Sequence, residues 1–268
     1  MELHIRHETV YRYDESVKRS VQSLRLTPRR DPVQRALNWS ISAPGRQHEQ
    51  IDTYGNVVHL LTLDEPHREI RIVVNGVVRT EDAGQMLPND GNLSPLTYLA
   101  QTPLTRADPA IAEFAGKCLP RSGGRGDDLL KLADAVSGTI RYERGATDVH
   151  ESASRAFARG KGVCQDQAHV FIAACRSAGI PARYVSGYIY TGNDGEVASH
   201  AWADAWLGPD VGWMAIDVTH RTLAGGQHCR LAVGRDYLDA CPIRGVRRGG
   251  GAEAMHVAVI VATSAQQQ

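Results

Sequence analysis

Residues 160–188 read GKGVCQDQAHVFIAACRSAGIPARYVSGY, and this stretch decides how the core of the chain is interpreted. After Cys164, four apolar residues have the i, i+3, i+4, i+7 spacing of a helix face: Ala168, Phe171, Ile172 and Cys175. Gly179 and Pro181 are typical of a helix end, and the segment from Ala182, rich in Tyr, Val and Ile, predicts a strand. We therefore expect a helix that begins at or next to Cys164, followed by a strand.

The position of Cys164 raises four alternatives: a small core residue, half of a disulfide, a metal ligand or a nucleophile. The chain has 5 cysteines at irregular spacing and no Cys-x-x-Cys pair, which disfavours a disulfide framework and a zinc site. A cysteine in front of a helix is most often structural, and Cys175, in the middle of the apolar stripe, fits that role. The unpaired N–H groups and the dipole of a helix N-terminus nevertheless favour a thiolate and can stabilise an oxyanion. Cys164 is a nucleophile only if a base lies beside it.

The composition is that of a globular protein without a strong charge bias. Of the 268 residues, 42% are hydrophobic, and 30 Lys and Arg balance 30 Asp and Glu. This balance gives no reason to expect binding to nucleic acid or to an anionic membrane. The first residues, MELHIRHETVYRY, lack the apolar core of a signal peptide, and no apolar run approaches the length of a membrane span. We therefore expect a cytoplasmic protein.

The patterning changes along the chain and predicts two domains. Residues 1–82 alternate as β-strands do, with a Gly-Asn step in DTYGNVV and a tight turn expected at Asn75-Gly76 within REIRIVVNGVVRT. Residues 83–97, rich in Asp, Asn, Gly and Pro, predict a linker. Residues 98–268 contain helical segments around DPAIAEFAGKCL and DDLLKLADAVSGTIRY. We expect a β domain followed by an α+β core.

A partner for Cys164 is available in SHAWADAWLGPDVGWMAIDVTH, which predicts two strands joined across LGPD. If Leu207 to Asp210 form the loop, pairing along the ladder places His200 opposite Asp217, on the same face of the hairpin. That register is an assumption, because a slip by one residue would turn Asp217 away. Cysteine, histidine and aspartate would then form a nucleophile, a base and an orienting carboxylate. A purely structural His–Asp pair is the alternative.

Three segments resemble the bacterial transglutaminase-like cysteine hydrolases: GVCQDQAHVFIAACRSAGIPARYVSGY, SHAWADAWL with GWMAIDVTH, and LAVGRDYLDACPIRG. HETVYRYDESVKRSVQSLRLTPR and DTYGNVV are similar to the β domain that precedes the core in that group. The resemblance implies an N-terminal antiparallel β domain and a papain-like core with helices packed on an antiparallel sheet. It also implies thiol-based acyl transfer at amide bonds, with no metal or organic cofactor, and its nucleophile, base and acid correspond to Cys164, His200 and Asp217. The chain departs from the family where DVTH replaces the usual Asp-Pro-Thr or Asp-Ala-Thr.

Several neighbouring residues have both a structural and a functional interpretation. Gln165 and Asp166 are expected to cap the helix rather than line the site. His169 is expected to be solvated or hydrogen-bonded, and His220 ranks below the histidine of the hairpin as a base. Tyr142 is a candidate oxyanion donor. The hairpin tryptophans are expected in the core rather than in a substrate groove: Trp202, Trp206 and Trp213.

Cys164, His200 and Asp217, together with the resemblance, predict an enzyme. It would attack an amide carbonyl of a peptide or protein through Cys164 and form a thioester. Resolution by water would make it a cysteine peptidase or amidase, and resolution by an amine would make it a protein-glutamine gamma-glutamyltransferase. We expect hydrolysis, because water is always present whereas an amine needs its own site. A catalytically silent peptide-binding module and a redox or metal sensor that uses Cys164 are the alternatives. No residue demands a homodimer, although the sheets of two copies could pair by their edges.

Overall fold

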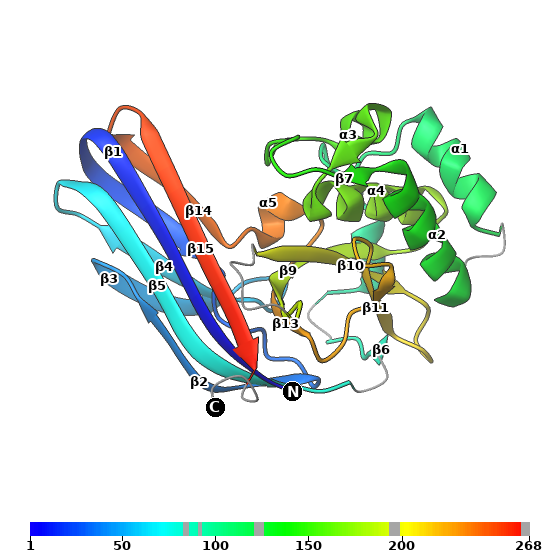
Figure 1. The fold of residues 1–268 in the computed structure, drawn as a ribbon, viewed down its shortest axis with the longest axis horizontal. Coiled ribbons are helices and arrows are strands. Elements are labelled where there is room, and N and C mark those ends of the chain that lie inside the picture. The colour runs from blue at the N-terminus through cyan, green and yellow to red at the C-terminus, as the bar shows by residue number, and fades with distance from the viewer. Residues whose placement is uncertain (83–85, 91–92, 121–125, 193–198, 264–268) are drawn as a thin grey trace.

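The structure is a computed structural model that describes residues 1–82, 86–90, 93–120, 126–192 and 199–263. It contains two large antiparallel β-sheets, one formed mainly by the start of the chain and one covered by helices (Figure 1). The predicted combination of an N-terminal β domain with a core of helices and strands is therefore found. The predicted linker at 83–97 lies partly outside the described residues.

The first sheet is built around one long strand, β1 (Glu2–Leu24). Its order is β2-β5-β1-β4-β3, with β2 (Gln34–Ser42), β3 (Arg46–Ile51), β4 (Val57–Leu63) and β5 (His67–Thr80). Leu3 and Ile5 near the start of β1 and Leu24 at its end are buried, and alternation along much of the strand directs one face to the core. The absence of helices predicted for residues 1–82 is confirmed.

The turn expected at Asn75-Gly76 is not formed, because β5 runs through both residues. A Cβ at position 76 would lie 2.2 Å from Cε3 of Trp39 on the neighbouring strand β2. This glycine is therefore needed because an indole occupies the space of a side chain. The Gly-Asn step in DTYGNVV does lie between β3 and β4, and Gly55 there has a φ of 76°.

The end of the chain returns to the first sheet. β14 (Ile243–Gly249) and β15 (Glu253–Thr263) both pair with β1, and the red and blue strands lie together in Figure 1. These strands were grouped with the core in the predicted division at residue 98, but they complete the N-terminal sheet. The physical reason is that β1 has two edges of backbone hydrogen-bonding groups, of which β4 and β5 fill only one.

The second sheet has the order β12-β11-β10-β9-β13. Its strands are β9 (Ala182–Ile189), β10 (His200–Trp206), β11 (Trp213–Asp217), β12 (Thr222–Leu223) and β13 (His228–Gly234). The predicted linker contributes β6 (Met86–Leu87), which pairs with β11, and a 3-10 helix, η1 (Pro95–Leu99). A separate parallel pair is formed by β7 (Arg141–Tyr142) and β8 (Lys161–Gly162).

The helices are α1 (Pro109–Cys118), α2 (Gly126–Thr139), α3 (Ala153–Arg159), α4 (Cys164–Ser177) and α5 (Tyr237–Ala240). α4 is central, since α1, α2 and α3 contact it and it also packs on β9 and β10. All residues from Gln165 to Arg176 are buried, so both faces of α4 are covered and not only the predicted stripe. In the described part of the chain, no helix is long and apolar enough to cross a membrane.

The two domains meet along β13, the edge strand of the second sheet. The Gln34 side chain donates to the Arg230 carbonyl at 2.7 Å and accepts from the Arg230 amide at 2.8 Å. Asn56 makes the same pair of bonds with Val233, both at 2.8 Å. Two side-chain amides thus take the place of a neighbouring strand, and they close this edge of the core sheet.

Candidate active site

Cys164 is the first residue of α4, as the sequence predicts. The helix start is held by Asp166, whose Oδ2 accepts hydrogen bonds from the Val163 amide at 2.7 Å and from the Thr147 hydroxyl at 2.6 Å. A Cβ at Gly162 would lie 2.5 Å from the same oxygen, so the chain needs glycine there. The capping role expected for Asp166 is confirmed, and the thiol beside it is half-buried.

Two backbone donors lie next to the thiol. Within the described residues, the amides of Cys164 and Gln165 have no acceptor, whereas the next two amides bond to the Val163 carbonyl. Free N–H groups of this kind are usual at a helix N-terminus and carry the positive end of its dipole. The Gln165 side chain does not cap the helix, contrary to expectation. It donates to the Val149 carbonyl at 3.2 Å and lines the cavity in front of the thiol.

His200, at the start of β10, donates from Nε2 to Oδ2 of Asp217, at the end of β11, over 2.8 Å. The register that brings them together differs from the predicted one. Asp204 pairs with Ala215, so the loop between the strands is two residues longer than expected. A shift by two positions keeps each side chain on its face, and the two residues now meet diagonally rather than directly opposite one another.

His200 links the carboxylate to the thiol. Burial lowers the pKa of His200, but hydrogen bonds with Asp217 and Cys164 outweigh this and raise the pKa to about 10. Because Nε2 donates to Asp217, Nδ1 is the ring nitrogen left for the thiol. The structure thus brings together the three residues that the sequence selected.

Asp217 is completely buried and receives two further histidines. His220 donates from Nδ1 to Oδ2 at 2.7 Å, and His228 donates from Nε2 to the same oxygen at 2.9 Å. Burial raises the pKa of Asp217, but the three hydrogen bonds outweigh it and hold that pKa well below the usual range. The sequence pointed to His220 but not to His228, because nothing in the local sequence GGQHC indicates that β13 lies near the end of β11.

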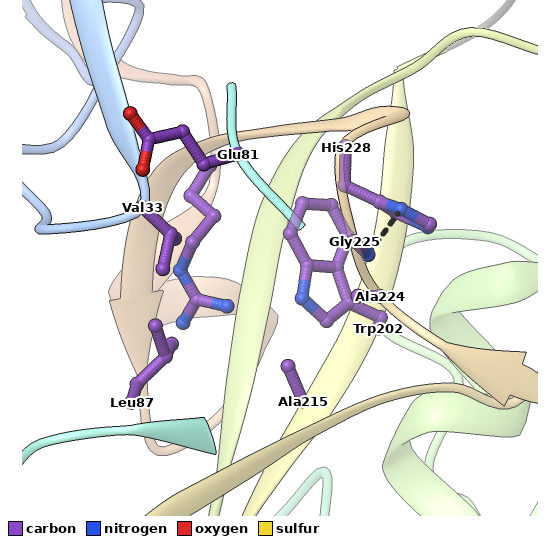
Figure 2. A pocket seen from close by; sticks show the side chains of 9 residues that line it. Val33, Glu81, Leu87, Trp202, Ala215, Ala224, Gly225 and His228 are labelled. Atoms are coloured by element: carbon purple, nitrogen blue, oxygen red, sulfur yellow. Dashed lines mark hydrogen bonds between the residues drawn. The ribbon is translucent and has the colours of Figure 1, made fainter. Parts of the chain in front are cut away.

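The cluster around Asp217 contains the types of side chain that bind metal ions. Ligand atoms of His200, Asp217 and His228 all lie within 4.8 Å of one another, which would suit a transition metal by distance. However, the Gly225 amide donates to Nδ1 of His228 at 3.1 Å, the dashed line in Figure 2. The proton of a neutral ring is then on Nε2, the nitrogen that would have to bind the metal. The residues fit a hydrogen-bonded carboxylate and do not fit a metal centre.

A cavity of about 340 Å³ lies in front of Cys164 and His200, within the size range of small-molecule sites. Its apolar and aromatic lining includes Tyr142, Val149, Val163, Tyr184, Tyr237 and Pro242. The lining also includes Arg144, an exposed residue with no ion pair to any described residue. Tyr142 therefore lines the same cavity as the thiol, which is compatible with its candidate role.

The remaining residues singled out in the sequence have structural roles. Trp202 and Trp213 are completely buried and Trp206 packs against the second of them, so the expected core role is confirmed. His169 is also completely buried, and its Nε2 accepts a hydrogen bond from the Tyr237 amide at 3.1 Å. Burial and the charge of Arg176 lower the pKa of His169 to about 3, so this histidine is hydrogen-bonded and not solvated.

Comparisons with known proteins agree over most of the chain. Residues 113–218 match the transglutaminase-like superfamily, and residues 3–79 match the bacterial transglutaminase-like N-terminal region. An uncharacterised protein from Mycobacterium leprae is 32% identical over 272 residues, which cover 94% of this chain and 95% of that protein. A protein-glutamine gamma-glutamyltransferase from Pseudomonas aeruginosa is 31% identical over 105 residues, 33% of this chain and 15% of that protein.

A solved structure has the same fold. The crystal structure of a presumed cysteine protease from Cytophaga hutchinsonii matches with a TM-score of 0.78 and 23% identity, covering 98% of this chain and 91% of that chain. This likeness extends through both sheets. Together with the relative from M. leprae and the two matched regions, it shows that the chain belongs to the transglutaminase-like superfamily and carries the bacterial transglutaminase-like N-terminal region ahead of its core.

Proposed function

We propose that the protein is a thiol-dependent acyl-transfer enzyme that acts on amide bonds of peptides or proteins, with Cys164 as nucleophile, His200 as base and Asp217 as orienting acid. The observation that carries the proposal is the imidazole of His200, which hydrogen-bonds to the buried carboxylate of Asp217 and lines the same cavity as the Cys164 thiol. Membership of the superfamily and the fold likeness to a presumed cysteine protease support this class of chemistry. The core is proposed to have the papain-like layout.

In the first half-reaction, Nδ1 of His200 takes the thiol proton and the sulfur of Cys164 attacks the amide carbonyl carbon. The C–S bond forms while the carbonyl π electrons move to oxygen, and the free amides of Cys164 and Gln165 are placed to stabilise that oxyanion. When the tetrahedral intermediate collapses, the C–N bond breaks. The leaving amine receives the proton from His200, and a thioester remains on Cys164.

In the second half-reaction, His200 takes a proton from water as the water oxygen attacks the thioester carbon. The C–S bond breaks, the carboxylic acid leaves, and the sulfur regains its proton from His200. The high pKa of His200 depends partly on Cys164, so formation of the C–S bond in the first half-reaction, which consumes the thiolate, removes one cause of it. The imidazolium is then a stronger acid when it must protonate the leaving amine.

A transferase differs only in the second step, where a primary amine replaces water. The similarity to the P. aeruginosa gamma-glutamyltransferase favours this second candidate over part of the core. Incubation of glutamine-containing peptides with and without a primary amine separates the two. Hydrolysis yields the free acid in both samples, whereas a transferase yields the amine adduct as the main product.

The proposal is tested by the rate at which iodoacetamide alkylates Cys164 between about pH 5 and pH 10, followed by peptide mass spectrometry. Cys118 at the end of α1 is an internal standard, since it is also half-buried and burial raises its pKa. At about pH 6, below the range in which an ordinary thiol ionises, we expect Cys164 to react at least about tenfold faster than Cys118. His200→Gln should remove most of this difference.

If Cys164 reacts no faster than Cys118 at any pH, and His200→Gln changes nothing, the protein has no activated nucleophile. A catalytically silent binding module would then be the better function. In that case Cys164→Ala should bind peptides with unchanged affinity, whereas the enzyme proposal requires the same variant to lose all turnover.

A further inference from the structure

His228 is the buried residue at the start of β13 that shares Oδ2 of Asp217 with His200. It has no part in the two half-reactions described above, and it does not line the cavity in front of Cys164. Its contacts nevertheless reach the carboxylate on which the orientation of His200 depends.

The hydrogen bonds of His228 define its tautomer. The Gly225 amide donates to Nδ1 at 3.1 Å, as Figure 2 shows, so Nδ1 is an acceptor without a proton. Nε2 therefore carries the proton and donates it to Asp217 at 2.9 Å. A second proton on this ring would place two N–H groups against each other at Nδ1. Burial also lowers the pKa of His228, in agreement with a ring that stays neutral.

Of the three histidines that share Asp217, the two buried ones, His200 and His228, therefore differ in whether they can exchange a proton. His200 must gain and lose a proton in each half-reaction, and its hydrogen bond to Asp217 changes strength as it does so. His228 is held neutral and donates to the same oxygen throughout the cycle. A donor that cannot change its proton state fixes the carboxylate in one orientation while the other donor cycles.

The surrounding side chains keep the two rings in place. The Trp202 ring stacks with His200 at 6.0 Å between centroids and meets His228 edge-on at 5.2 Å. Behind these residues is a cavity of about 20 Å³, enough for about one water, between Trp202, Leu87 and Val33 in Figure 2. Arg230 and Glu81 also line this space, and Arg230 is paired with Asp204 and Asp31.

We propose that His228 is a positioning residue for the acyl-transfer reaction: it acts through Asp217, which it holds in the orientation that His200 requires. The inference rests on the proposed function of Cys164 and His200. It assigns His228 no contact with substrate, and it predicts an effect on the chemical step rather than on substrate binding.

Two substitutions of similar size separate the two hydrogen bonds of His228. His228→Gln places an amide nitrogen near the position of Nε2 and can donate to Asp217. His228→Asn places an amide oxygen near the position of Nδ1, where it can accept from Gly225, but it is too short to reach Asp217. We expect His228→Asn to lower kcat by about 10- to 100-fold with KM changed less than about threefold. His228→Gln should retain kcat within about threefold.

The alkylation rate of Cys164 provides a readout that needs no substrate. At about pH 6 it should fall about tenfold or more in His228→Asn and stay within about threefold of wild type in His228→Gln. Equal effects of the two variants, or no effect of either, would overturn the positioning role. This failure is distinct from that of the proposed function, in which wild-type Cys164 itself is no more reactive than Cys118.

A measurement on the wild-type protein keeps the inference testable if the variants do not fold. Nitrogen-15 NMR of the histidine rings should show His228 as the neutral tautomer with its proton on Nε2 between about pH 5 and pH 8. A ring that titrates in this range, or that carries its proton on Nδ1, would contradict the proposed role.

Discussion

The ring centroids of His200 and His220 lie 5.2 Å apart, and both rings donate a hydrogen bond to Oδ2 of Asp217. The two histidines differ in their surroundings. The side chain of His200 is 7% exposed and lines the cavity with Cys164, whereas that of His220 is 44% exposed and does not line the cavity. Only His200 is therefore placed to exchange a proton with the thiol.

We expect His200→Ala to lower kcat by about 10²- to 10⁴-fold, the usual contribution of a general base. His220→Ala should lower it by less than about threefold, because this side chain is 44% exposed, so water can replace its hydrogen bond, and the backbone amide of residue 220 still donates to Oδ1 of Asp217. Steady-state kinetics on a peptide or amide substrate measures both. A loss in His220→Ala as large as that in His200→Ala would make His220 the base.

Gly162→Ala should destabilise the protein, because a Cβ at this position would lie 2.5 Å from Oδ2 of Asp166 and 2.7 Å from its Cβ. Asp166 cannot move away without releasing the Val163 amide at the start of α4. We expect a loss of about 1–3 kcal/mol in the free energy of unfolding, measured by urea denaturation.

The matched control is Gly116→Ala in α1, where a Cβ has nothing within 4 Å. This exposed helical position should gain up to about 1 kcal/mol, because alanine favours a helix over glycine. Similar stability changes in the two variants would show that the contact between Gly162 and Asp166 is not the cause.

Stability should depend on the charge of His200. The pKa of His200 is raised to about 10, above the value of about 6.5 expected in the unfolded chain. The folded state thus favours the proton, so this contribution is complete below about pH 6.5 and is lost as the pH rises toward about 10. The free energy of unfolding of wild type should fall more steeply over this range than that of His200→Gln, by more than about 1 kcal/mol.

Denaturant unfolding at a series of pH values measures this slope. His169→Gln is the control, because burial and Arg176 lower the pKa of His169 to about 3, so the folded ring is neutral over the whole range and the unfolded ring, with a pKa of about 6.5, loses its remaining proton near the start of it. The alkaline slope of this variant should equal that of wild type. Equal slopes in wild type and His200→Gln would contradict the predicted charge.

Asn56→Ala should weaken the contact between the two domains along β13. The Asn56 side chain bonds to the amide and the carbonyl of Val233 and accepts from Arg29 at 2.8 Å. Its removal leaves three buried polar groups without this partner, so we expect a loss of about 2–4 kcal/mol in the free energy of unfolding.

The control for Asn56→Ala is Asn38→Ala, at an exposed position on β2. This variant should change the free energy of unfolding by less than about 0.5 kcal/mol. Equal and small effects of Asn56→Ala and Asn38→Ala would show that water replaces the hydrogen bonds of the Asn56 side chain without loss of stability.

Some structural features followed from the sequence because they depend on residues close together in the chain. The apolar spacing after Cys164 located a helix whose start the structure confirms, and alternation in the hairpin put His200 and Asp217 on one face. The error of two positions in the register did no harm, because side chains of a strand repeat their direction every second residue. By contrast, the turn expected at Asn75-Gly76 was wrong, since the glycine there serves Trp39 on another strand.

The sequence by itself thus determined the local elements, the two-domain order and the three residues of the candidate site. The tertiary structure decided that β14 and β15 belong to the first sheet, that Gln34 and Asn56 close the edge of the second, and that His228 shares the carboxylate of Asp217. These relationships join segments that are far apart in the chain or on different strands. Periodicity and turn chemistry report only local backbone preference, whereas such contacts exist only once both sheets have formed and each buried polar group has found its partner.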